Sequence, residues 1–88
     1  MFKTTLKIDG MMCGMCEAHI NDVIRKTFPN AKKVSSSHKK GVSTFLLEEK
    51  PDRDVLETAI GETGYKLMEM SCEPYNPKES NIFSKLFG

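Results

Sequence analysis

Two cysteines three residues apart stand in the segment Gly10-Met11-Met12-Cys13-Gly14-Met15-Cys16. Residues 2–9 before it alternate between apolar and polar side chains, which predicts a half-buried β-strand. Residues 17–28 after it repeat their apolar positions at helical spacing. The thiols therefore stand where a loop becomes a helix, and the positive end of a helix lowers the pKa of a thiol. We expect Cys16 to lean toward the core and Cys13 to stay accessible. Such a pair is either a soft-metal site or a redox dithiol.

The rest of the chain continues with strand and helix patterns. Residues 42–47 are a β-rich run after the turn signal Lys39-Lys40-Gly41, so we expect residues 31–38 to pair with them as the edge strand of a hairpin. A second helix follows Pro51-Asp52, and residues 65–72 form the last strand. We expect alternate side chains of that strand on opposite faces, with Leu67 on one and Met68, Met70 and Cys72 on the other. The order βαββαβ predicts an α+β, ferredoxin-like sandwich, in which an antiparallel four-stranded sheet carries both helices on one face.

The composition describes one ordinary globular domain. The chain has 88 residues, of which 39% are apolar and 28% charged, and it is too short for two separate cores. A net charge of +1 argues against binding to nucleic acid, which needs a basic surface. No segment has the run of about 18 apolar residues that a membrane span needs, and the first residues lack the pattern of a secretory signal. Three cysteines, two of them close together, suit a reducing compartment. We therefore expect a cytoplasmic protein without membrane insertion.

In its loop and its element order the chain resembles the heavy-metal-associated domains. This family includes copper chaperones, the N-terminal metal-binding domains of copper-transporting P-type ATPases, and mercury-binding proteins. The family pattern Gly-Met-x-Cys-x-x-Cys is matched by residues 10–16. The resemblance implies that Cys13 and Cys16 bind the metal. It also implies that Met11 is a buried residue that shapes the loop, and that Tyr65 packs against the loop, as in similar bacterial copper chaperones.

The make-up of the loop favours Cu(I) as the bound metal. Two thiolates without a neighbouring carboxylate suit Cu(I), which accepts two or three soft ligands, whereas zinc usually takes four. Relatives that select zinc often carry an acidic residue where this chain has Met12. Ag(I), Hg(II) and Zn(II) remain candidates, and so does a mercury- or zinc-handling role for the same fold. A third ligand is also open, and the candidates are His19, Met12, Met15 and a thiolate of a partner protein.

These features predict a Cu(I) metallochaperone that passes copper to the metal-binding domain of a copper-transporting P-type ATPase. Two exposed sites that share copper would join two chains in a metal-bridged homodimer. The alternative is a dithiol–disulfide oxidoreductase with Cys13 as the accessible nucleophile. Thioredoxin-like enzymes usually carry a proline in or beside their Cys-x-x-Cys pair, where this chain has Gly14-Met15. The sequence shows no general base and no substrate cleft, so we do not expect an enzyme.

The remaining residues receive structural interpretations. We expect Cys72 to be a packing residue remote from the loop, and His38, beside two lysines, to be solvated. The resemblance implies a heavy-metal-associated domain at residues 1–73, followed by an extension at residues 74–88. In that extension one side of a short amphipathic helix would carry Ile82, Phe83, Leu86 and Phe87. This helix would either fold back over the open face of the sheet or dock a partner.

Overall fold

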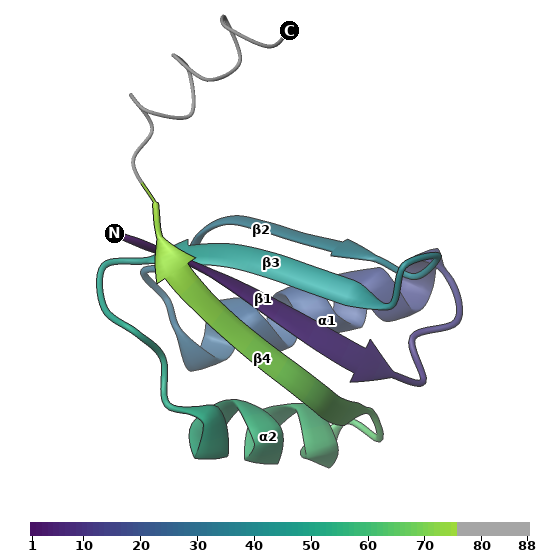
Figure 1. The fold of residues 1–88 in the computed structure, drawn as a ribbon. Helices are drawn as coiled ribbons and strands as arrows, with labels where there is room; N and C mark the ends of the chain where they lie inside the picture. Colours follow the sequence, from purple (N-terminus) through teal and green to yellow (C-terminus); the bar gives the residue numbers. More distant parts are fainter. Residues whose placement is uncertain (76–88) are drawn as a thin grey trace, which may run out of the picture.

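The computed structural model of the chain describes residues 1–75 and shows six elements in the order βαββαβ (Figure 1). They are β1 (Phe2–Asp9), α1 (Gly14–Thr27), β2 (Lys32–Ser37), β3 (Val42–Leu47), α2 (Arg53–Glu62) and β4 (Lys66–Pro74). The strands form one sheet in the order β2-β3-β1-β4. Both helices lie on the same face of that sheet. The predicted ferredoxin-like fold is confirmed.

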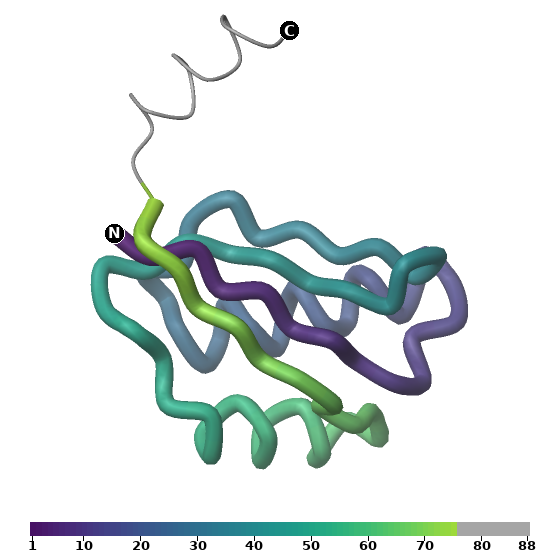
Figure 2. Tube along the Cα trace, viewed as in Figure 1, coloured from purple at the N-terminus to yellow at the C-terminus, as the bar shows by residue number. Residues whose placement is uncertain are grey.

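Strand β1 lies in the middle of the sheet and runs antiparallel to both of its neighbours. Its partners in β3 extend from Phe2↔Leu47 to Lys7↔Val42, and on its other side it pairs with β4. The trace of β1 accordingly runs between those of β3 and β4 in Figure 2. Strand β2 occupies the edge position predicted for it. Within residues 1–75, neither helix is long and apolar enough to cross a membrane.

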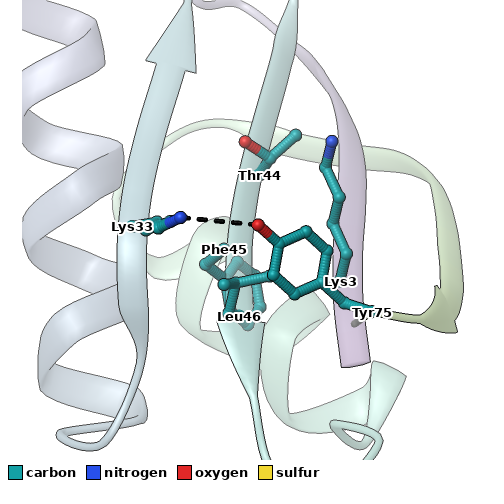
Figure 3. Close-up of a pocket in the computed structure, with 6 residues that line it drawn as sticks. All are labelled: Lys3, Lys33, Thr44, Phe45, Leu46 and Tyr75. Carbon is teal, nitrogen blue, oxygen red and sulfur yellow. Dashed lines mark hydrogen bonds between the residues drawn. The ribbon is translucent and has the colours of Figure 1, made fainter. Parts of the chain in front are cut away.

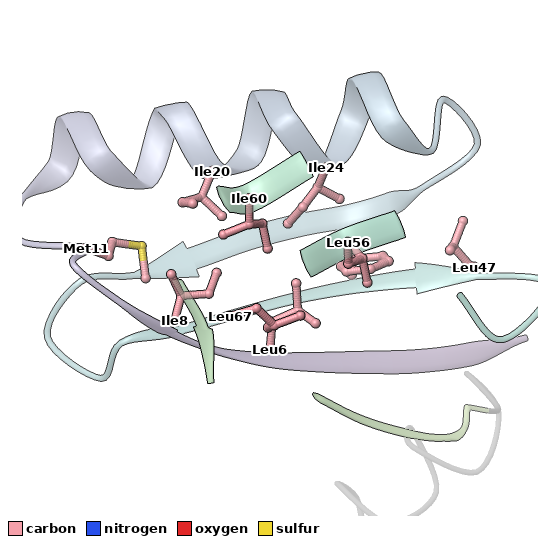
Figure 4. Close-up of a cluster of buried hydrophobic side chains, with 10 residues drawn as sticks. Leu6, Ile8, Met11, Ile20, Ile24, Leu47, Leu56, Ile60 and Leu67 are labelled. Atoms are coloured by element: carbon pink, nitrogen blue, oxygen red, sulfur yellow. The ribbon is translucent and has the colours of Figure 1, made fainter. Parts of the chain in front are cut away.

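The hydrophobic core fills the space between the sheet and the two helices (Figure 4). Helix α1 buries Ile20 and Ile24, and α2 buries Leu56 and Ile60, each pair being one helical turn apart. The sheet and the loop before α1 supply the other members, namely Leu6, Ile8, Met11, Phe45, Leu47 and Leu67. Burial of such side chains contributes about 25 cal/mol for each Å² of apolar surface removed from water.

Strand β2 is polar, and one of its serines makes side-chain hydrogen bonds to α1 and to β3. The hydroxyl of Ser36 donates to Oδ1 of Asn21 in α1 at 2.6 Å. The same hydroxyl lies 2.7 Å from the hydroxyl of Ser43, which is fully buried in β3. A buried hydroxyl is costly unless it has a partner, and here the two serines and the asparagine satisfy one another.

The predicted alternation along the last strand is wrong, because β4 contains a β-bulge. The register against β1 shifts between Lys7 and Ile8, so that Leu67 pairs with Ile8 and Met70 pairs with Leu6. A bulge adds one residue to one strand, which reverses the faces of all the residues beyond it. Leu67 and Met70 consequently both pack against the core. Met68 is left 46% exposed.

The open face of the sheet carries Tyr75 beside Leu46 (Figure 3). The backbone N–H of Tyr75 donates to the carbonyl of Met1 at 2.9 Å, and Nζ of Lys33 donates to the hydroxyl of Tyr75 at 3.4 Å. These contacts lie in a small hollow lined by Lys3, Lys33, Thr44, Phe45, Leu46 and Tyr75. The predicted helix of the extension lies outside the described residues, so its proposed cover of this face stays a prediction.

Candidate metal centre

The loop between β1 and α1 is fixed to the fold at Gly10 and Met11. Gly10 has φ +98°, a left-handed conformation that glycine adopts without strain. A Cβ at this position would lie 3.4 Å from Cδ1 of Tyr65, so the loop passes close to the tyrosine ring. The side chain of Met11 is only 4% exposed and points into the core (Figure 4). The residues that follow, which include both cysteines, therefore lie in a loop that Met11 anchors to the core.

The two cysteines lie at the N-terminus of α1. Cys13 is the N-cap, with an extended backbone, and Cys16 is in the first turn. Their Sγ atoms are 3.7 Å apart and both thiols are free. Cys13 is exposed, whereas Cys16 is half-buried and packs against the core. Helix α1 begins at Gly14, and Cys13, with its extended backbone, accepts the first helical hydrogen bond from the N–H of Glu17 at 3.2 Å.

The spacing of the two sulfurs fits a shared metal ion. Two metal–sulfur bonds of about 2.3 Å span about 3.8 Å when they meet at a tetrahedral angle, and about 4.6 Å when they are collinear. The observed 3.7 Å is close to the first value. The second is within reach of a rotation of the Cys13 side chain, which is exposed. The pair can hold an ion with bent or linear coordination without a change in the backbone.

The environment of Cys16 favours the thiolate form. Hydrogen bonding from the Tyr65 hydroxyl is the largest influence, and hydrogen bonds from the backbone of Met12 and Cys13 add to it. Together they outweigh the opposing effect of burial and lower the pKa of the Cys16 thiol from 9.0 to about 7. The pKa of Tyr65 is raised by the same contact with Cys16. Because thiolates rather than thiols bind metals, Cys16 is prepared for a metal near neutral pH.

The two histidines contact residues around the candidate site. Nδ1 of His19 lies 3.4 Å from the Tyr65 hydroxyl, so His19 contacts the residue that supports the loop. His38, which we expected to be solvated, instead binds Glu17. Its backbone N–H donates to Oε2 of Glu17 at 2.7 Å, and its Nδ1 lies 2.8 Å from the same oxygen. These hydrogen bonds lower the pKa of the Glu17 carboxyl.

The other predicted candidates lie apart from the two sulfurs. Met12 and Met15 are 80% and 70% exposed, so they flank the thiols on the outside of the loop. Cys72 pairs with Thr4 in the sheet, and its sulfur accepts a hydrogen bond from the Thr4 hydroxyl at 3.6 Å. Among residues 1–75 no three His, Cys, Asp or Glu side chains come together as a metal-binding group. The site that this part of the chain offers is a pair of sulfurs with an open side.

The contact between Glu17 and His38 is the feature that the sequence did not reveal. The two residues are 21 positions apart, one after the second cysteine and the other beside the hairpin turn. No local pattern links them, because their approach depends on how α1 crosses the sheet. The available signal was weaker: a carboxylate in the first turn of a helix, and a histidine at the end of an edge strand on the same side of the fold.

Known proteins with similar sequence or structure handle heavy metals. The chain is 32% identical over 85 residues to a mercuric reductase of Serratia marcescens; the match covers 97% of the chain and 18% of the reductase. Its fold is similar to that of oxidized MerP from Ralstonia metallidurans CH34, with a TM-score of 0.62, 21% identity, and coverage of 84% of this chain and 100% of MerP. It is also similar to the CopZ metallochaperone, with a TM-score of 0.55, 18% identity, and coverage of 75% and 98%.

These comparisons confirm the resemblance to the heavy-metal-associated domains. No family profile matches the chain. The chain spans about a fifth of the length of the reductase that it matches, so the likeness concerns one domain of that protein. At these levels of identity the two solved structures support the fold.

Proposed function

We propose that this chain binds one soft metal ion between Cys13 and Cys16 and passes it to a partner protein by exchange of thiolate ligands. The observation that carries the proposal is the pair of free thiols 3.7 Å apart at the start of α1, one exposed and the other with a lowered pKa. Met11 and Tyr65 would support the site, the first by anchoring the loop and the second by stabilising the thiolate of Cys16.

The open side of the sulfur pair suggests how the metal would move. A partner thiolate can approach the exposed Cys13 and add to the ion as a third ligand. One of the original sulfurs then leaves, and the ion reaches the partner without being released into water. The exposed thioethers of Met12 and Met15 would form the apolar rim that the partner contacts.

Cu(I) is the metal that we propose first, and Ag(I) shares its preferences. Soft sulfur donors select Cu(I), whereas zinc takes four ligands in structural sites. The described part of the chain gathers only two such donors. The proposed acceptor is the metal-binding domain of a copper-transporting P-type ATPase, and the proposed compartment is the reducing cytoplasm, where both thiols stay free. At high copper, two chains would share ions in a homodimer.

Hg(II) is a second candidate, and a specific observation favours it. The Serratia relative is a mercuric reductase, and it matches nearly the whole of this chain. Hg(II) is soft and forms stable bonds with two thiolates, so the same sulfur pair suits it. In that case the domain would capture Hg(II) and deliver it to a reductase or another mercury-handling protein.

A competition titration tests the proposal. Reduced protein would be titrated without oxygen with Cu(I), and separately with Hg(II), against a chelator of known affinity. We expect about one ion per chain, and a loss of at least a hundredfold in affinity for Cys13→Ser. Cys72→Ser is the matched control and should bind like the wild type, because Cys72 lies in the sheet beside Thr4.

The same proteins separate metal binding from redox catalysis. A dithiol–disulfide oxidoreductase would reduce insulin and would lose that activity in Cys13→Ser. Failure to retain either metal, together with insulin reduction, would reject the metal-binding proposal in favour of the redox one. Retention of Hg(II) in the presence of a competing thiol that removes Cu(I) would select mercury as the cargo.

A further inference from the structure

The Glu17 carboxylate is held beside residues 10–16, which carry both cysteines and are called the metal loop below. One oxygen, Oε2, takes both hydrogen bonds from His38, at 2.7 Å from the backbone nitrogen and 2.8 Å from Nδ1. The other oxygen, Oε1, lies 4.0 Å from the point that a Cβ on Gly14 would occupy. Gly14 lies between the two cysteines, so the carboxylate borders the site while it faces the β2–β3 hairpin. The expectation that no carboxylate lies near the thiols was therefore wrong, because the first turn of α1 brings Glu17 beside Gly14.

Glu17 has the position needed to reach a metal ion on the cysteines. It follows Cys16 directly and is four residues after Cys13, to whose carbonyl its N–H donates. Gly14 and Glu17 are three residues apart in the first turn of α1, so their side-chain positions are neighbours, and Gly14 stands between the two cysteines. A glutamate here, free to rotate, could add an oxygen to an ion between the two sulfurs. Its hydrogen bonds to His38 keep it turned toward the hairpin instead.

We propose that His38 determines metal specificity by holding the Glu17 carboxylate on the hairpin, which keeps a hard oxygen donor away from the ion on Cys13 and Cys16. This inference rests on the proposed function, since it concerns the choice among metals at that site. His38 acts through Glu17 and does not touch the ion, so it is a positioning residue.

The selectivity follows from the preferences of the metals. Zn(II) takes four ligands and accepts carboxylate oxygens at about 2.0–2.2 Å, so a third protein ligand strengthens its binding. Cu(I) prefers soft sulfur donors and gains little from a carboxylate. A carboxylate bound to His38 therefore disfavours zinc without weakening the soft-metal site. Releasing it should change the affinity for Zn(II) and leave that for Cu(I) unchanged.

The test compares Zn(II) and Cu(I) affinities of the intact chain and its variants by competition with chromophoric chelators. In His38→Ala the ring hydrogen bond is lost. The backbone N–H of His38 still donates to Glu17 in this variant, so the carboxylate is only partly released, and we expect the affinity for Zn(II) to rise severalfold while that for Cu(I) stays within twofold. Adding Glu17→Gln to His38→Ala should abolish the rise, because the amide is a poorer zinc ligand.

Controls make each outcome decisive. Lys40→Ala changes an exposed residue of the same hairpin and should leave both affinities unchanged. His38→Phe keeps the size of the ring without Nδ1, and it replaces the alanine variant if that one is poorly folded. An unchanged Zn(II) affinity, an equal rise for both metals, or a rise that persists without Glu17 would overturn the inference. Failure of the wild type to bind either Cu(I) or Hg(II) would instead reject the proposed function itself.

Discussion

Tyr65 acts on the metal loop through its hydroxyl. Hydrogen bonding from this group is the largest cause of the lowered pKa of Cys16, which is about 7. We predict that Tyr65→Phe raises the pKa of Cys16 toward its ordinary value of 9.0, because the thiolate loses its strongest donor. About half of the Cys16 thiols are ionised at pH 7 in the wild type, so alkylation by iodoacetamide at that pH should slow severalfold in the variant.

The alkylation experiment needs a chain with a single thiol. Cys13→Ser with Cys72→Ser leaves Cys16 as the single thiol, and the serine at position 13 keeps a polar hydroxyl beside it. The pH profile of the alkylation rate then reports one titration. Tyr75→Phe is the matched control, because Tyr75 lies on the open face of the sheet beside Lys33. A profile that is identical with and without the Tyr65 hydroxyl would contradict the prediction.

Met11 and Met12 are neighbours with opposite structural roles. Met11 is 4% exposed and belongs to the core, whereas Met12 is 80% exposed. We predict that Met11→Ala lowers the free energy of unfolding by about 2–4 kcal/mol, because it leaves a cavity under the loop. Met12→Ala should change the same quantity by less than about 0.5 kcal/mol. Urea denaturation of the reduced proteins without metal measures both, and equal effects would show that Met11 does not anchor the loop.

For single residues, the sequence predicted the exposure of a side chain correctly where its neighbours in space are also close in the chain. The difference in exposure between Cys13 and Cys16 follows from a loop that leads into an amphipathic helix, whereas the burial of Met11 was implied by the family resemblance. The solvated state expected for His38 was wrong, since its partner Glu17 is distant in the chain. Which of these residues bind metal remains a prediction until the titrations are made.

Helix α1 begins at the candidate metal site, and its first turn is joined to the β2–β3 hairpin by the hydrogen bonds between Glu17 and His38. These hydrogen bonds lower the pKa of Glu17 below its usual value of 4.5. A carboxyl whose pKa is lower in the folded state stabilises the fold fully above its unfolded pKa. That stabilisation is lost as the pH falls through the folded pKa, because the Glu17 carboxyl is then protonated in the folded state as well as in the unfolded state.

We therefore predict a stability difference that depends on pH. Wild type should exceed Glu17→Gln in its urea midpoint at pH 7, and the difference should shrink as the pH falls below about 4.5. The other carboxyl groups are common to both proteins and cancel in the comparison. Asp22→Asn is the control, since Asp22 is on the same helix and makes only an exposed contact with Arg25 at 3.7 Å. A difference that is constant from pH 7 to pH 3 would refute this account.

Whole elements were predicted well where one face is buried and the period is regular. Strand β1 has the predicted bounds, because its apolar side chains alternate without interruption. In β4 the bulge opposite Lys7 and Ile8 interrupts the alternation of side chains between the two faces. No pattern in residues 65–72 predicts this bulge. The polar strand β2 was predicted from the turn that follows it. Its hydrogen-bond partners, Asn21 and the buried Ser43, became visible only in the fold.

The fold as a whole places a reactive loop at one end of a packed sandwich. The core holds Met11 from below, and α1 fixes Cys16, while Cys13 faces the solvent. Such an arrangement lets a partner reach the ion while the protein keeps its shape. It also implies that metal binding and folding are linked, because only the folded chain holds both sulfurs in a fixed position at the start of α1.

This linkage gives a prediction for the whole molecule. A ligand that binds only the folded state at a free concentration of about 100 times its dissociation constant stabilises that state by about 2.7 kcal/mol. In a domain of this size each kcal/mol raises the melting temperature by about 4–8 °C. Buffered Cu(I) at that level should therefore raise the melting temperature of the wild type by about 10–20 °C.

Two variants decide whether the stabilisation comes from the proposed site. Cys72→Ser keeps both loop sulfurs and should show the full rise, whereas Cys13→Ser leaves one sulfur and should show less than half of it. Differential scanning fluorimetry under nitrogen measures both at the same buffered copper. The unfolded chain can also bind copper through its remaining cysteines, which makes the rise smaller than binding to the folded state alone would give. A rise of equal size in Cys13→Ser would therefore place the copper elsewhere, since the pair of sulfurs at the start of α1 exists only when both cysteines are present.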